Sequence, residues 1–295
     1  MRIENDRIAA EIDLHGAELT SLKKRDTDEE LIWTADKQYW GRHAPMLFPI
    51  VGKVWNGEYR VGDEIYSLPQ HGFARDHDFK LLCQDKESVT LCLESDDQSL
   101  KVYPYRFRIE ATYRLEDNTL VVEWRIKNPG SETMFFQIGA HPGFNYREFS
   151  KDDFIHGYFR VISGDEPVRR LVIGQLTPDG YRSENAAMIE LDSDAMLPIT
   201  PGLFTNDALV LEEYQTDQII LYDKDCNPYI SVETPDAPVW GLWSPPSKNA
   251  PFVCIEPWMG RCDFQGYQGD ITGRDYINSL EAGKSSAFCY RITAI

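Results

Sequence analysis

The sequence predicts an all-β protein, organised as a large antiparallel β-sandwich. Long segments such as residues 105–115 and 120–126 alternate apolar and polar side chains, which is the period of a strand with one buried face. No window longer than about ten residues carries the 3.6-residue period of an amphipathic helix. Because turn residues separate the alternating segments, we expect consecutive strands to pair antiparallel in a meander.

The first part of the chain predicts short strands that are joined by turns. Residues 7–24 alternate on both sides of a glycine, which indicates two strands. Asn56-Gly57 is a strong short-range signal for a two-residue hairpin, and it predicts a turn that joins strands around Val54 and Tyr59.

The rest of the chain continues the strand pattern with one interruption. The turn signal Asn-Pro-Gly leads into a strand over residues 134–141. Residues 146–185 are rich in Asp, Gly, Pro and Ser, and we predict an irregular excursion there. No linker, charge block, low-complexity segment or short repeat is found, so we predict one domain over residues 1–295. Further strands are predicted at residues 205–211, 218–223, 229–233 and 252–258.

With 30 Lys and Arg against 48 Asp and Glu, the chain carries a formal net charge of −18. This acidic excess argues against a nucleic-acid partner, because phosphate contacts need clustered basic side chains. The six cysteines form no Cys-x-x-Cys pair, so neither a zinc ribbon nor a disulfide framework is indicated. Free thiols in a reducing cytosol are therefore expected.

The charged N-terminal segment, Met1 to Asp6, does not resemble a signal peptide. No apolar run approaches the length of about 18 residues that indicates a membrane span. We therefore expect a cytoplasmic protein without a membrane partner, present as a monomer or a homodimer.

Two ionisable residues stand at strand ends, each directly before a proline. In residues 134–141 one face is uniformly apolar, whereas the other face ends in His141; Glu256 ends a later strand in the same way. In a sandwich with an open concave face, both could point into one cleft, where an imidazole and a carboxylate suit general acid–base catalysis. A neighbouring carboxylate raises the pKa of a histidine, so we expect His141 as imidazolium acid and Glu256 as base. Alternatively, His141 is a strand-end histidine bonded to a neighbouring carbonyl.

Residues 69–79 form a polar loop that contains several candidate ligand-binding groups. His71 stands beside Gly72, which marks a place where the backbone lets a ligand come close. His77 and Asp78 have a weaker claim, and we interpret them as surface residues. The alternative for the whole loop is a solvated cluster of charges.

The chain carries five distinctive short segments: Glu4-Asn5-Asp6 with Gly16-Ala17-Glu18-Leu19, Ala44 to Gly52, Gln70 to Arg75, His141 to Phe144, and Glu256 to Trp258. In sequence and in order, they resemble the aldose 1-epimerase (galactose mutarotase-like) family, and within it the LacX-like branch. Each segment alone is a weak signal, but the common order of all five is specific and extends over most of the chain.

This resemblance implies a β-supersandwich with an open concave substrate face. It implies an isomerase that interconverts the α and β anomers of an aldose. The family's histidine matched by His141 protonates the ring oxygen, and the glutamate matched by Glu256 takes the proton from the anomeric hydroxyl. The residues matched by His71, Arg75 and Asp207 bind the monosaccharide. We expect neither a cofactor nor a metal ion.

One departure from the family concerns the sugar. Better-studied galactose mutarotases carry a Gly-Arg and an Asn-Arg pair early in the chain, whereas residues 52–57 of this sequence lack the second arginine. Galactose or glucose is therefore not carried over as the substrate. A phosphorylated aldose, and hence a hexose-6-phosphate mutarotase, stays open, with Arg42, Lys53 and Arg75 as the basic residues near the motifs.

Three other functions stay open as alternatives. A carbohydrate-binding or regulatory protein would keep the histidine–glutamate pair without turnover. A glycoside-cleaving enzyme needs two carboxylates that flank the scissile bond, which Asp207 and Glu256 could supply. A metal-dependent sugar isomerase would take its ligands from four residues whose spacing is uncommon for a metal site: His71, His77, His141 and Glu256.

Overall fold

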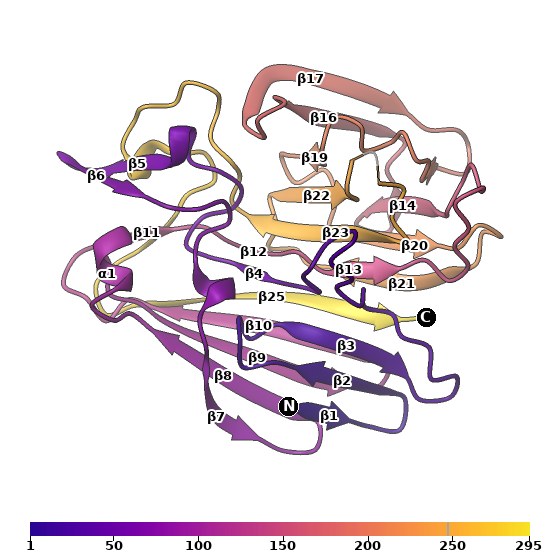
Figure 1. Ribbon diagram of the computed structural model, residues 1–295, viewed down its shortest axis with the longest axis horizontal. Coiled ribbons are helices and arrows are strands. Elements are labelled where there is room, and N and C mark those ends of the chain that lie inside the picture. The colour runs from indigo at the N-terminus through magenta and orange to yellow at the C-terminus, as the bar shows by residue number, and fades with distance from the viewer. Residues whose placement is uncertain (247) are drawn as a thin grey trace.

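The computed structural model describes residues 1–246 and 248–295 and shows two large antiparallel sheets (Figure 1). This architecture confirms the predicted all-β fold class. The ten-stranded sheet has the order β15 (Glu166–Pro167), β14 (Tyr158–Ser163), β20 (Gln218–Tyr222), β21 (Pro228–Glu233), β25 (Ser285–Ala294), β10 (Thr119–Lys127), β9 (Arg108–Glu116), β8 (Ser88–Glu94) and β7 (Lys80–Gln84), and β18 (Met196–Pro198) pairs with β14.

The second sheet has eight strands and supplies most of the residues that concern function. Its order is β17 (Arg182–Glu190), β16 (Arg170–Leu176), β19 (Leu209–Leu211), β22 (Val239–Trp243), β23 (Phe252–Met259), β12 (Ile138–Ala140) and β4 (Met46–Leu47), and β13 (Gly143–Asn145) pairs with β23. One hydrophobic cluster contains buried residues of both large sheets, for example Ile255 and Ile292.

Smaller elements complete the part of the chain that the structure describes. None of its helices is long and apolar enough to cross a bilayer. The N-terminal strands β1 (Arg2–Glu4), β2 (Ile8–Ile12) and β3 (Leu19–Lys24) form a three-stranded sheet, β11 (Met134–Phe136) pairs with β24 (Asn278–Leu280), and β5 (Glu58–Val61) pairs with β6 (Glu64–Ser67). The helices are α1 (Ser99–Val102) and three 3-10 turns, η1 (Trp55–Gly57), η2 (Ala74–Asp76) and η3 (Ile271–Gly273).

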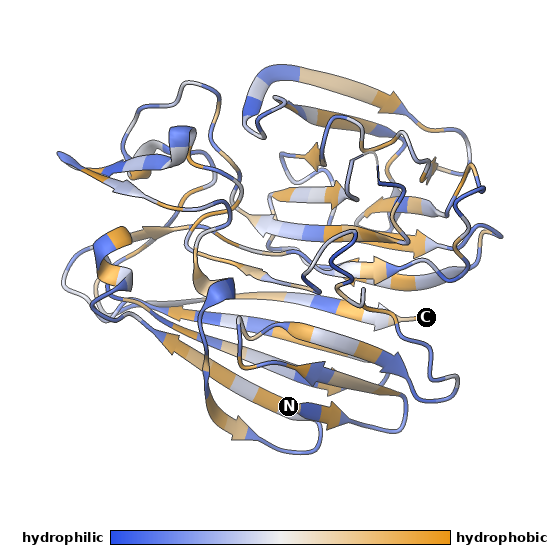
Figure 2. Ribbon diagram, in the orientation of Figure 1, coloured by the Kyte–Doolittle hydropathy of each residue, from blue (hydrophilic) through white to orange (hydrophobic). Residues whose placement is uncertain are grey.

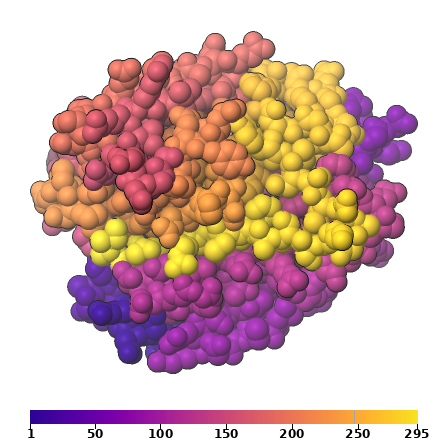
Figure 3. Space-filling view, turned by 180° about the vertical axis from the view of Figure 1, so that it is seen from behind, coloured from indigo at the N-terminus to yellow at the C-terminus, as the bar shows by residue number. Residues whose placement is uncertain are grey.

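The C-terminal strand β25 joins early and late parts of the chain into one sheet. It pairs with β10 on one side and with β21 on the other. Seen from behind, its yellow residues cross the molecule between the orange and the magenta parts of the chain (Figure 3).

The predicted meander is confirmed in β8, β9 and β10. Along β9, Ile109, Ala111, Tyr113 and Leu115 are buried, and every residue between them is partly or fully exposed. The colours of Figure 2 alternate along these strands in the same way. The period-two pattern therefore correctly predicted which face of this sheet packs on the core.

The predicted irregular excursion over residues 146–185 is wrong, because β14, β15, β16 and the start of β17 lie there. Phe159 and Val161 in β14 are buried, and so are Leu171 and Ile173 in β16. A strand that pairs with an existing sheet needs only a few alternating apolar residues to be stable. Polar and turn-forming residues in the connections and on exposed faces masked these alternations.

The predicted hairpin at Asn56-Gly57 is also wrong. Both residues adopt the left-handed φ values, 54° and 76°, that the dipeptide favours. They belong to η1, in which the Gly57 N–H donates to the carbonyl of Val54 at 3.0 Å, and Tyr59 pairs instead with Tyr66 of β6. The dipeptide set the local backbone conformation but not the partner of the strand that follows.

Strand β23 lies in the interior with every residue buried. It pairs with β22 on one side and with β12 and β13 on the other. Its Trp258 indole packs between two glycines of these neighbours. A Cβ atom on Gly139 would lie 2.8 Å from the indole, and one on Gly241 would lie 2.6 Å from it.

We predict that Gly241→Ala displaces the Trp258 indole and lowers the free energy of unfolding by about 1–3 kcal/mol, as overpacking of a rigid interior does. Urea denaturation measures this loss. Gly202→Ala is the matched control, because the nearest atom to its added Cβ is 4.0 Å away. Equal stability of the two variants would contradict the close packing around Trp258.

Candidate active site

All five site residues that the sequence predicts line one cavity of about 780 Å³, a volume in the usual range for small-molecule sites. The cavity therefore brings together groups that are up to 185 residues apart in the chain, from His71 to Glu256. The lining consists of Trp40, Arg42, Gly52, Gln70, His71, Arg75, His141, Leu176, Thr177, Pro178, Gly180, Thr205, Asn206, Asp207, Ala208, Val210, Trp243, Pro246, Glu256, Trp258 and Cys262.

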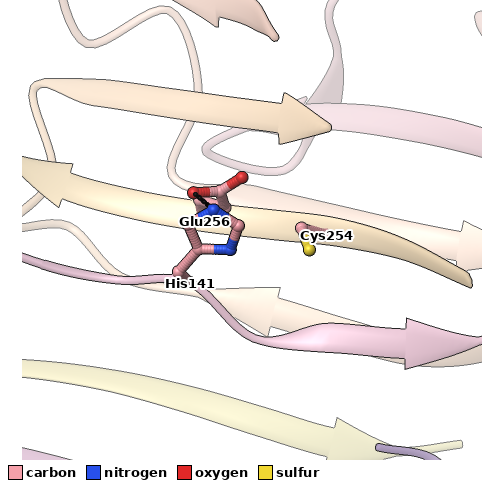
Figure 4. Close-up of side chains that lie close together, drawn as sticks. All are labelled: His141, Cys254 and Glu256. Atoms are coloured by element: carbon pink, nitrogen blue, oxygen red, sulfur yellow. Dashed lines mark ion pairs between the residues drawn. The ribbon is translucent and has the colours of Figure 1, made fainter. Parts of the chain in front are cut away.

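The register of β12 and β23 places His141 opposite Glu256. Gly139 pairs with Trp258, and Gly143 of β13 pairs with Cys254 further along the same strand. His141 lies midway between these two pairs, and so does Glu256 on its own strand. Directly opposite side chains on one face of an antiparallel pair lie close together. The His141 Nε2 atom is 3.1 Å from the Glu256 Oε2 atom (Figure 4).

Aromatic rings hold the His141 imidazole in place. The Trp40 ring stacks on it, with centroids 4.7 Å apart and planes at 28°. Trp243 meets the imidazole edge to face, with centroids 5.5 Å apart. Sequence reasoning did not assign Trp40 or Trp243 to the site, since no local pattern links either one to a distant histidine.

Burial controls the ionisation of the pair. His141 is 7% exposed and Glu256 is 1% exposed. Burial, reinforced by the Arg75 charge, lowers the pKa of His141 to about 3. Burial and the charge of Asp207 raise the pKa of Glu256 well above its usual range. The sequence predicted the opposite direction for His141, because it considered the attraction of the carboxylate and not the cost of removing both groups from water.

These shifts favour a neutral imidazole and a protonated carboxyl group. The two groups then hold one proton in total. One group can donate a proton and the other can accept one, which is the requirement for acid–base catalysis.

His71 faces the cavity in a fixed tautomer. Its backbone is in the left-handed region, with φ 66°, and its Nδ1 atom accepts a hydrogen bond from the Gly52 N–H at 3.0 Å. Nδ1 therefore carries no proton, so the neutral ring carries its proton on Nε2. Burial lowers the pKa of His71 well below its usual range, with a smaller contribution from the charge of His141. His71 thus presents one N–H donor in the cavity lining, with the side-chain amide of Gln70 beside it, 3.3 Å from Nε2.

Two arginines lie together at one side of the cavity. The Arg75 Nη2 atom donates to the Gln70 carbonyl at 2.7 Å, and burial lowers the pKa of Arg75 to about 10, with the charge of Arg42 as the next cause. Arg42 forms an ion pair with Asp76 at 2.7 Å. Asp207, whose φ is 73°, lies on the loop before β19 and accepts the N–H of Ala208 at 3.0 Å.

The four metal ligands of the isomerase alternative are not all brought together. The Nδ1 atom of His77 bonds to the Phe73 carbonyl at 2.9 Å, and His77 does not line the cavity. Within residues 1–246 and 248–295, the metal-ligating side chains that lie together are His141, Cys254 and Glu256. Cys254 was not assigned to the site from the sequence, although it shares a strand face with Glu256.

Together, the fold and the site define a β-supersandwich protein with a buried imidazole and carboxylate in a cavity of small-molecule size. A family model described as aldose 1-epimerase matches residues 1–264. The chain therefore belongs to the aldose 1-epimerase family, as the five sequence motifs predicted.

Individual relatives agree with this assignment. The Lactococcus lactis subsp. lactis protein LacX (chromosomal) is 30% identical over 276 residues, which cover 88% of this chain and 87% of that protein. A galactose mutarotase related enzyme from Lactobacillus acidophilus superimposes with a TM-score of 0.92 at 36% identity and covers 100% of this chain and 97% of its own. A galactose mutarotase-like protein from Lactobacillus casei ATCC 334 gives a TM-score of 0.91 at 30% identity, over 100% and 99% of the two chains. These similarities confirm the predicted supersandwich.

We predict that His71→Asn weakens binding of an aldose by about tenfold, which corresponds to one hydrogen bond of about 1.4 kcal/mol. Asparagine tolerates the left-handed backbone of this position, so the fold is kept while the Nε2–H donor is lost. Quenching of the fluorescence of Trp40, Trp243 and Trp258, which line the cavity, measures the dissociation constant.

His77→Asn is the control for this experiment, because His77 belongs to the same segment but lies outside the cavity lining. The two variants should differ in aldose affinity. If both bind the sugar like the unchanged protein, His71 has no part in binding.

Proposed function

We propose that the protein is an aldose 1-epimerase that interconverts the α and β anomers of an aldose through His141 and Glu256. One observation carries the proposal: these two buried groups, from distant parts of the chain, lie 3.1 Å apart in the wall of a sugar-sized cavity. Family membership and the sequence motifs support it.

The reaction needs one proton donor and one proton acceptor. Ring opening takes the proton from the anomeric hydroxyl and delivers a proton to the ring oxygen, so that the C1–O5 bond breaks and an aldehyde forms. In the family assignment, His141 donates and Glu256 accepts. After rotation about the C1–C2 bond, the reverse transfers close the ring on the other face of the aldehyde.

The pair holds one proton before and after each step. Donation by an imidazolium to the ring oxygen, together with uptake by the carboxylate, leaves a neutral imidazole and a carboxylic acid. This second state is the one that burial favours. The cycle therefore alternates between the two one-proton states of the same pair, and each such group contributes typically about 10²–10⁴ in rate.

Other cavity groups hold the sugar in this proposal. His71 contributes its Nε2–H donor, Arg75 contributes guanidinium donors, and the Asp207 carboxylate accepts from hydroxyl groups. Trp40, Trp243 and Trp258 contribute indole surface to the cavity lining, and in this proposal the C–H face of a pyranose ring packs against it.

A phosphorylated aldose is the second candidate substrate. Arg42 and Arg75 both line the cavity, and the buried Arg75 Nε atom has no hydrogen-bond partner, with the Asp76 carboxylate 3.9 Å away. Two adjacent guanidinium groups give a local positive charge in a protein of net charge −18, and arginine suits bidentate contacts with phosphate.

We predict that His141→Asn and Glu256→Gln each lower catalysed mutarotation by at least about a hundredfold, since each removes one proton-transfer group. Polarimetry of freshly dissolved pure anomers, phosphorylated and unphosphorylated, measures the rate and identifies the sugar. Glu256→Gln keeps the size of the side chain, whereas His141→Asn replaces the imidazole by a smaller polar group, and thermal unfolding monitors the fold of both variants.

Two results would contradict the proposal. Wild-type rates in both variants would remove His141 and Glu256 from the reaction. Retained sugar binding without turnover in the unchanged protein would instead support the carbohydrate-binding alternative.

We further predict that kcat/KM is flat between about pH 5 and pH 6.5 and shows no inflection near the ordinary histidine pKa of about 6.5. Because the pKa of His141 is lowered to about 3, the pair gains a second proton only well below pH 5. Activity is expected to fall only there. The raised pKa of Glu256 keeps the single proton bound as the pH rises above the usual carboxylate range.

Polarimetry across the pH range, with the protein-free rate subtracted at each point, measures this profile. A fall in kcat/KM on the acid side that is centred near pH 6.5 would show that His141 titrates like a solvated histidine. That result would contradict the proposal that the pair holds a single proton over this pH range.

A further inference from the structure

The thiol of Cys254 lies beside the His141–Glu256 pair and has no part in the proposed reaction. Cys254 precedes Glu256 by two residues on β23, so both side chains lie on the same face of the strand. The residue is fully buried. Burial and the charge of Glu256 raise the pKa of the thiol well above its usual range, which argues against a nucleophilic role.

Three different metal-ligating groups meet at this point. A nitrogen of His141, the sulfur of Cys254 and an oxygen of Glu256 lie within 4.8 Å of one another (Figure 4). Tetrahedral zinc, with bonds of about 2.0–2.3 Å, separates its ligand atoms by about 3.3–3.8 Å. The His141 Nε2 and Glu256 Oε2 atoms are 3.1 Å apart, and adjustments of about 1 Å bring the other ligand atoms, which lie within 4.8 Å, into this range.

A second observation is that two of these residues, His141 and Glu256, carry buried polar atoms without a hydrogen-bond partner in the protein. The His141 Nδ1 atom is buried and has no hydrogen-bond partner. The Glu256 Oε2 atom is also buried, and its contact with His141 does not have hydrogen-bond geometry. Buried polar atoms are normally paired, so atoms of this kind in a cavity wall indicate a ligand.

Charge and access are also suitable for a cation. A thiolate, a carboxylate and a neutral imidazole together carry two negative charges, which balance a divalent ion. Binding would release one proton from the thiol and one from the carboxyl group, because metal ligands must be deprotonated. His141 and Glu256 line the cavity, which provides the entry path and a fourth coordination position for water.

We propose that His141, Cys254 and Glu256 bind one thiophilic divalent cation of the zinc class, and that this cation blocks the acid–base pair. The mixed nitrogen, sulfur and oxygen donor set selects zinc-like ions over magnesium or calcium, which prefer oxygen ligands. The inhibitory effect rests on the proposed mutarotase function, whereas cation binding itself does not.

Titration of the sugar-free protein with Co²⁺ and Cd²⁺ tests binding independently of activity. We expect a thiolate-to-metal charge-transfer band that saturates at one equivalent. Cys254→Ala should abolish the band. Cys262→Ala is the matched control, because Cys262 is also buried and lines the cavity but lies outside the three-residue cluster, and this variant should keep the band.

Glu256→Gln provides an independent test if Cys254→Ala does not fold. It keeps the thiol and removes the carboxylate ligand, so the cation should bind at least about tenfold more weakly. A band that persists in folded Cys254→Ala, the absence of a band in the unchanged protein, or unchanged affinity in Glu256→Gln would each overturn the site.

Polarimetry with Zn²⁺ then tests the functional consequence. The unchanged protein should lose mutarotation at one equivalent and regain it with a chelator, and Cys254→Ala should need at least about tenfold more Zn²⁺ for the same inhibition. Equal inhibition of both proteins would overturn the proposed block. If the unchanged protein shows the charge-transfer band but no mutarotation, the proposed mutarotase function is refuted. The proposed metal site is then still supported.

Discussion

The site depends on the antiparallel register between β12 and β23. This register sets His141 against Glu256 across two neighbouring strands, although 115 positions separate them in the chain. Since side chains alternate along a strand, a slip of one residue would turn one of the two groups to the other side of the sheet. Trp258 and the flanking Gly139 and Gly241 fill the space beside the pair so closely that larger residues would not be accommodated. The same packing that stabilises the sheet therefore sets the geometry of the cavity wall.

Burial gives this pair its chemical character. A solvated imidazole and carboxylate at neutral pH would form an ion pair, whereas removal from water disfavours both charges. The pKa values of His141 and Glu256 move in opposite directions as a result, and the pair holds one proton in total. His71 is neutral for the same reason, and its bond to Gly52 directs an N–H into the cavity. Arg75 also lines the cavity, and its pKa of about 10 keeps it charged at neutral pH, so the cavity combines neutral proton-transfer groups with charged groups for binding.

Much of the fold and part of the site could be predicted from the sequence. Alternation identified the meander, because it depends on neighbouring residues. The prolines after His141 and Glu256 drew attention to both residues, but the predicted strand end at Glu256 is wrong, since β23 continues through Pro257 to Met259. The strands within residues 146–185 were missed, since their stability comes from the sheet that they join. Trp40 and Cys254 were missed because their contacts with His141 are tertiary. The direction of the His141 pKa shift was wrong because the extent of burial is a property of the whole fold.

The central claim is that this buried pair moves protons at the hemiacetal of an aldose. Exchange NMR of an aldose at anomeric equilibrium tests it most directly, because it reports interconversion without net chemical change. The account predicts exchange between the α and β anomeric protons that depends on the unchanged protein and disappears with Glu256→Gln. Protein-dependent exchange that persists in Glu256→Gln and in His141→Asn would contradict it.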